Sequence, residues 1–166
     1  MASELKVDKI FNAGGDQDSG INLATNDTIK FDIATSTKAT MASTGIVTIV
    51  GEGGTNTTNL QQGLAKAWVN FDGTASGAAA RDSLNVSTMT DRGTGKFTIT
   101  FATVMGNTNY NSVASATVGG EANYNRSAGA ASNATNFSYL NTFESSGNTA
   151  LVDAAYTSAT FHGDLA

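Results

Sequence analysis

Histidine and carboxylate side chains, the usual metal ligands and acid–base groups, are few in this sequence and lie far apart. His162 is the only histidine. Because a metal site needs several ligands that converge on one ion, we interpret it as an ordinary surface or interface residue. Asp16, Asp18 and Asp91 lie in turn-forming stretches, but a calcium site needs about six to eight oxygen ligands at set spacing. We interpret these acids as turn-stabilising residues and expect no metal or cofactor.

The acidic residues of the second half do not form a recognisable catalytic pair. They are spread singly along the chain, at Asp72, Asp82, Asp91, Glu121, Glu144, Asp153 and Asp164. Cleavage of a glycosidic bond needs two carboxyl groups that flank one substrate groove. No G-x-S-x-G elbow accompanies His162 for nucleophilic chemistry. The sequence therefore predicts a protein that is not an enzyme, with a polysaccharide-degrading spike as a lesser alternative.

Aromatic side chains offer the other kind of chemistry, because their rings can stack on sugars. The candidates are Trp68, Tyr110, Tyr124 and Tyr139. Trp68 lies within an alternating strand pattern, which favours packing in the core or at an interface. Residues 122–134 are small and polar, so we predict a surface loop there. Because loops carry binding functions more often than strands do, we expect receptor contacts in the loops at 73–80 and 119–134. The residues that we single out for such contacts are Tyr124, Asn125 and Arg126.

The composition favours short strands and tight turns over a charged globular surface. Charged residues make up 14% of the 166-residue chain, against about 25% in ordinary domains, and Asn, Thr, Ser, Gly and Ala take their place. Such a surface need not repel its neighbours, as in an assembly. The net charge is −5 and the nine basic residues are scattered. Nucleic-acid binding needs clustered Lys and Arg, so neither nucleic acid nor an anionic membrane surface is an expected partner.

The sequence contains no pattern typical of a membrane-spanning helix or a signal peptide, and it contains no disulfide-forming residue. No apolar run approaches the ~20 residues of a membrane-spanning helix, so no membrane insertion is expected. The N-terminus lacks the apolar stretch of a signal peptide, from which we expect folding in a cytoplasm without export by that route. The chain contains no cysteine, so disulfides cannot stabilise it.

The apolar pattern of residues 1–55 predicts short strands that cannot form a hydrophobic core on their own. Alternating apolar residues or apolar runs occur at 5–10, 21–23, 28–33 and 46–50. Each strand buries only two or three apolar side chains, which at about 25 cal/mol per Å² hardly offsets its ordering entropy. We therefore expect identical strands from neighbouring chains to complete this segment. Residues 56–63 are predicted to be a polar linker, with room for one helical turn.

Residues 64–166 predict an antiparallel β-sandwich, because strands recur at near-regular spacing between Gly and Asn turns. The predicted strands are 66–72, 81–86, 96–101, 111–118, 136–143 and 150–161, with a Gly-rich turn at 91–95. The residues that we expect in the core or at an interface are Trp68, Phe71, Phe97, Ile99 and Phe101. Because adjacent strand residues point to opposite faces, we expect Arg81 and Asp82 to have separate partners, Arg81 bonding a carboxylate or carbonyl of the sandwich.

Several blocks in this domain follow a recognisable order. They are Trp68-Val69-Asn70-Phe71-Asp72-Gly73-Thr74, then Arg81-Asp82-Ser83-Leu84-Asn85-Val86-Ser87, then Thr90-Asp91-Arg92-Gly93-Thr94-Gly95-Lys96-Phe97-Thr98-Ile99-Thr100-Phe101, and later Met105 and Asn109-Tyr110. This order resembles a C-terminal module of phage tail-fibre and related virion proteins, many of them from marine and cyanobacterial phages. Residues 5–10 and 24–31 are similar to the repeats that open many phage fibre proteins.

The resemblance implies a homotrimeric protein of the bacteriophage virion, assembled in the host cytoplasm. Its partners would be other virion proteins and, for an appendage, a glycan or protein on the host surface. We expect a tail fibre or short appendage for host attachment. A capsid decoration protein, such as a cement protein or head fibre, is the alternative that the resemblance leaves open.

Overall fold

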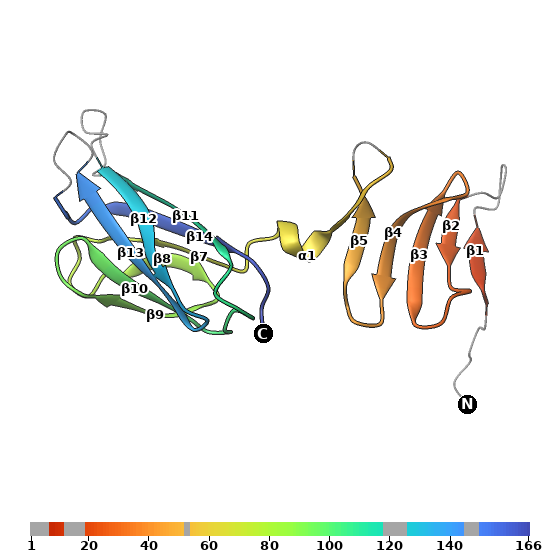
Figure 1. Cartoon of the computed structure of the whole chain (residues 1–166), viewed down its shortest axis with the longest axis horizontal. Coiled ribbons are helices and arrows are strands. Elements are labelled where there is room, and N and C mark those ends of the chain that lie inside the picture. The colour runs from red at the N-terminus through yellow and green to blue at the C-terminus, as the bar shows by residue number, and fades with distance from the viewer. Residues whose placement is uncertain (1–6, 12–18, 52–53, 118–125, 145–149) are drawn as a thin grey trace. The chain divides into compact units, whose positions relative to one another are not determined.

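The computed structural model describes residues 7–11, 19–51, 54–117, 126–144 and 150–166 (Figure 1). The chain divides into two compact units, residues 1–63 and 64–166. All strand pairs in the described residues are antiparallel, and the one helix has four residues. The predicted all-β class is therefore confirmed. No helix among these residues is long and apolar enough to cross a membrane.

The first unit is one six-stranded sheet whose strands follow each other in chain order. They are β1 (Lys9–Phe11), β2 (Gly20–Asn22), β3 (Thr28–Ile33), β4 (Ser36–Ala42), β5 (Val47–Val50) and β6 (Thr57–Asn59), followed by α1 (Leu60–Gly63). None of the described residues in this unit is buried. The sheet is a single layer, so no other described element of this unit covers either of its faces.

Two parts of this sheet differ from the sequence-based expectations. The segment at 56–63, predicted to be a polar linker with room for one helical turn, also contains the strand β6, because 57–59 pair with β5. The helical turn is present as α1, and it is bonded back to the sheet by Gln61. Its side-chain oxygen accepts from the Val47 amide at 3.0 Å, and its amide group donates to the Gly45 carbonyl at 2.6 Å. Strand β4 was not predicted, since its Ser, Thr and Lys residues interrupt the apolar alternation.

The second unit is a β-sandwich of two four-stranded sheets, as the sequence predicts (Figure 1). One sheet has the order β11-β14-β7-β8 and the other β12-β13-β10-β9. The strands are β7 (Ala67–Phe71), β8 (Ala80–Leu84), β9 (Val86–Asp91), β10 (Lys96–Phe101), β11 (Asn111–Thr117), β12 (Arg126–Asn133), β13 (Phe137–Glu144) and β14 (Tyr156–His162).

Aromatic rings from both sheets fill the space between them. Phe71 and Phe97 pack edge to face with ring centroids 4.9 Å apart, and Phe101 meets Phe161 at 5.1 Å. Ile99 is fully buried beside them. Trp68 is not in this core: its neighbours Ala67 and Val69 are buried, whereas Trp68 lies partly exposed on the outer face of β7. A side chain next to a buried residue in a strand must point the other way.

The predicted strand at 81–86 is broken in the structure, and its halves belong to different sheets. Asn85 forms the corner with a left-handed φ of 55°, so β8 ends before it in one sheet and β9 begins after it in the other. The Asn85 side chain donates to the carbonyls of Lys66 and Thr103 and accepts from the Thr103 amide at 2.6 Å. Asparagine tolerates this backbone conformation better than most residues.

The predicted surface loop at 122–134 is also wrong for its second half. Residues 126–133 form β12, which pairs with β13 along most of its length. The strand is rich in Ala, Ser and Gly, residues with no apolar alternation and little intrinsic strand preference. Pairing with β13 therefore makes it a strand, rather than its own composition. Tyr124 and Asn125 lie outside the described residues.

Candidate functional site

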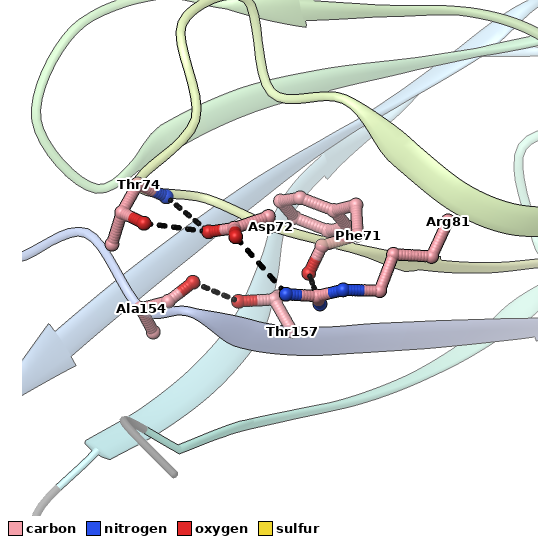
Figure 2. A network of polar contacts seen from close by, with 6 residues as sticks. All are labelled: Phe71, Asp72, Thr74, Arg81, Ala154 and Thr157. Carbon is pink, nitrogen blue, oxygen red and sulfur yellow. Dashed lines mark hydrogen bonds and ion pairs between the residues drawn. The ribbon is translucent and has the colours of Figure 1, made fainter.

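The charged residues singled out around Arg81 stabilise the sandwich (Figure 2). The Arg81 guanidinium donates to the Phe71 carbonyl at 2.9 Å and to the Asp72 carboxylate at 3.0 Å, which confirms the expected carboxylate or carbonyl partner. Asp72 accepts two further bonds, from the amide and the hydroxyl of Thr74. The Thr74 bonds, with a smaller contribution from Arg81, lower the pKa of Asp72 below its ordinary value of 3.8. These groups bond one another across the β7–β8 connection.

Two other candidate acids, Asp91 and Asp153, also accept hydrogen bonds that stabilise the local structure. Asp91 accepts from the Gly93 amide at 2.8 Å, as a turn-stabilising residue would, and Asp153 accepts from the Gly95 amide at 2.7 Å. His162 ends β14 opposite Asn111. Within the described ranges no group of three or more His, Cys, Asp or Glu residues could hold a metal ion. Asp16, Asp18 and Glu121 lie outside those ranges.

Strand β13 buries two hydroxyl side chains and keeps its aromatic side chains on the outer face, an arrangement that the sequence pattern did not predict. Its buried side chains are Ser138, Leu140 and Thr142, while four side chains alternating with them lie on the outer face of the sheet, partly exposed: Phe137, Tyr139, Asn141 and Phe143. The two buried hydroxyls are satisfied, by Asn133 for Ser138 and by the Val152 carbonyl for Thr142. The strand therefore turns its aromatic residues away from the core.

One cation lies over these rings and a second lies opposite Asn141 in the same sheet. The Arg92 guanidinium carbon is 4.1 Å from the centroid of the Tyr139 ring, and the Phe137 ring lies 4.7 Å from that of Tyr139. Lys96 is directly opposite Asn141 in the β10–β13 register. The Arg92 amide donates to the Lys96 carbonyl at 2.9 Å, so both cations flank the β9–β10 turn. We name this surface, defined by Arg92, Lys96, Phe137, Tyr139 and Asn141, the cationic–aromatic face.

A hollow adjoins the cationic–aromatic face on the side of β12. It measures about 300 Å³ and is lined by Gly129, Ala130, Ala131, Asn141, Phe143 and Leu151. Gly129 lies opposite Asn141, and a Cβ added to this glycine would meet no atom within 4 Å. The missing side chain therefore leaves open space in front of the sheet. We call this space the Gly129 hollow.

Arg126, predicted to contact a receptor from a loop, is the first residue of β12. Its guanidinium lies 3.3 Å from the Glu144 carboxylate, and both side chains are partly buried. This pair links the ends of two neighbouring strands, so the structure assigns Arg126 to the sheet edge.

A second surface of interest is one face of the first unit. The register places nine apolar side chains on the same side of the sheet: Ile10, Ile21, Ile29, Phe31, Ile33, Ala39, Met41, Val47 and Ile49. The opposite side carries Lys9, Lys30 and Asp32, with Asp32 bonded by Asn22 and Thr37. Five of the nine are more than a third exposed, from Ile29 at 39% to Ile33 at 56%. We name this surface the open apolar face.

Comparison with protein-family models, with curated proteins and with solved structures finds no match to this chain. The two surfaces described above are therefore the features that bear on its function. The cationic–aromatic face escaped the sequence analysis because alternation alone does not say which face of a strand is buried. The one available signal was the pair of cations around the turn at 93–95.

Proposed function

We propose that this protein is a non-enzymatic structural protein of a bacteriophage particle, a homotrimeric tail fibre or short appendage for host attachment. The first unit is the assembly segment, and the sandwich is the module offered to the host. The observation that carries the proposal is the open apolar face. A sheet with one hydrophobic face must bury that face against another layer, and the described residues of its own unit provide none.

Other copies of the same face are the occupants that best fit it. The paired positions on the open apolar face carry no charged residue, whereas Lys9, Lys30 and Asp32 project from the other side. Two or more such faces can therefore meet at these paired positions without burying a charge. Complete burial of a large aliphatic or aromatic side chain contributes about 1.5–3 kcal/mol. Covering the exposed half of five of them contributes roughly 4–8 kcal/mol per copy before association costs.

The number of copies and the viral origin are supported by the resemblance of residues 68–110 to fibre modules. Three copies around an axis turn three such faces toward a common interior, and they carry three sandwiches in parallel. Weak contacts to a host surface are then multiplied by avidity. The described carboxylates of the sandwich are occupied in turns and ion pairs, among them Asp72, Asp91, Glu144 and Asp153, in keeping with a role in binding.

The assembly is tested by light scattering on the purified full-length chain. The expected mass is three times the 16.9 kDa of one chain, and a stable monomer at micromolar concentration would argue against the proposal. The place in the particle is tested by immunogold labelling and by copy number in purified virions. Gold at the tail with a few copies supports the appendage. Gold spread over the head with hundreds of copies would replace it by capsid decoration.

A further inference from the structure

The aromatic rings of β13 lie on the outer face of its sheet, although a one-residue shift of register would place them in the core. Such a shift moves every side chain of a strand to the other face of its sheet. Phe137, Tyr139 and Phe143 would then be inside, and the hydroxyls of Ser138 and Thr142 would be in solvent. The strand instead buries the two hydroxyls with partners and holds three aromatic rings outside. Partly exposed aromatic rings gathered on one outer face make that face a candidate for ligand contact.

The two positive charges on the same surface favour an anionic ligand. Arg92 and Lys96 form no ion pair within the described part of the chain, although the protein as a whole is acidic. Like charges placed on either side of a turn repel each other. A bound anion would relieve this repulsion and would accept hydrogen bonds from both residues. Tyr139 already holds the guanidinium over its ring, so the donor is positioned before the ligand arrives.

The Gly129 hollow adds a requirement of shape. Most of its lining residues are apolar, with Asn141 as the one polar side chain among them. Ligand sites commonly combine an apolar concavity with a few polar groups that fix orientation. An acetamido group matches this hollow, because its methyl group can enter the apolar space while its amide bonds Asn141.

We propose that the cationic–aromatic face binds an acidic saccharide chain that carries acetamido groups. The carboxylates pair with Arg92 and Lys96, the C–H face of a sugar ring packs on the partly exposed aromatic rings, and an acetamido group enters the Gly129 hollow. All of these contacts lie within one sandwich. The proposal deepens the attachment role proposed above by naming the receptor class, but its binding step does not depend on the trimer.

Four oligomeric probes of equal length separate the contributions, measured by isothermal titration calorimetry with the full-length chain. Hyaluronan oligosaccharide has carboxylates and acetamido groups, oligogalacturonate has only the acid, chitin oligosaccharide has only the acetamido group, and poly-glutamate has charge without a sugar ring. We expect hyaluronan to bind tightest, oligogalacturonate more weakly, and the other two not measurably. Binding should weaken as salt is added, because exposed charges are screened.

Two variants assign the contacts, with one control. Arg92→Gln should weaken both acidic probes about tenfold, the loss of one charge-assisted hydrogen-bonding group. Gly129→Val projects its side chain into the hollow from a Cβ position that has no atom within 4 Å, so it should remove the advantage of hyaluronan and leave oligogalacturonate unchanged. Lys66→Gln removes the same charge just before β7, in the other sheet, and should change neither affinity.

The proposal is overturned if none of the probes binds, or if chitin oligosaccharide or poly-glutamate binds as tightly as hyaluronan. It is equally overturned if Arg92→Gln or Gly129→Val leaves the affinities unchanged. Light scattering on the same samples reports the trimer separately. A trimer that binds no saccharide contradicts this inference alone, while a monomer that binds as described contradicts only the assembly.

Discussion

Placing a positive charge at the centre of the open apolar face should abolish the trimer while leaving the sandwich folded. Phe31 is 45% exposed within one chain and lies between Ile21 and Ala39 in the sheet register. In a single chain, Phe31→Lys puts the ammonium group in water. In the trimer it buries an unpaired charge against apolar side chains, and that penalty is several kcal/mol per ion.

The expected magnitude follows from the number of copies. At about 3 kcal/mol per buried ammonium group, three copies lose about 9 kcal/mol, or more than six powers of ten in the constant for trimer formation. The half-exposed ring contributes roughly another 1 kcal/mol per copy through its lost burial. Because the dissociation constant of a trimer scales with the square of concentration, a dissociation midpoint of ~1 nM would shift to roughly 10 µM, so the variant should be mostly monomeric at about 1 µM in light scattering.

A matched control variant distinguishes an effect at the open apolar face from a general effect of adding a positive charge to the sheet. Thr48→Lys adds the same group to β5 on the opposite side of the sheet, at a position paired with Thr40 and Asn59. We expect it to remain trimeric. Trp68, which lies in the sandwich, reports by fluorescence whether that unit stays folded in both variants. A Phe31→Lys protein that is still a trimer, or equal dissociation of the two variants, would refute the assignment of the open apolar face.

Three further predictions concern the sandwich. The fragment 64–166 should fold alone and unfold cooperatively, because the buried core lies within it; a disordered circular-dichroism spectrum would contradict this. Gly95→Ala should destabilise the fold by about 3 kcal/mol or more in urea titration, since its Cβ would lie 2.5 Å from the Thr142 carbonyl oxygen at a φ of +66°. Gly77→Ala, at a φ of +83° with open space around it, should lose only about 1 kcal/mol, and equal losses would exclude the steric explanation. Asp72→Ala should be less stable than wild type at neutral pH. Because the pKa of Asp72 is lowered below 3.8, its carboxylate contributes above that pH and the difference should fade as the pH falls through the lowered pKa; a difference that is constant with pH would contradict it.

The fold class was predictable because it depends on local pattern. Alternating apolar residues in the segment at 96–101 indicate a strand wherever it packs, and Phe97, Ile99 and Phe101 are indeed buried together. The bond from Arg81 to a carbonyl and a carboxylate was also predictable, since a long cation beside a buried strand must reach such groups. The second unit begins at Leu64, where the composition of the sequence changes.

The candidate site was much less predictable, because its residues come together only through strand pairing. Arg92 meets Tyr139 after 46 intervening residues, and no local pattern joins them. Gly129 becomes the floor of a hollow only once β12 pairs with β13. Read alone, residues 126–133 are a stretch of small residues and were predicted to be a loop.

By itself the sequence determined that the chain forms antiparallel strands with Gly and Asn turns, and which side chains of a strand share a face. Only the tertiary structure decided which of those faces is covered. In β10 the aromatic residues point into the core, whereas in β13 they point out and Ser138 and Thr142 are buried. The physical reason is that alternation fixes relative orientation along one strand, while the inward direction is set by register with neighbouring strands and by packing of the opposite sheet.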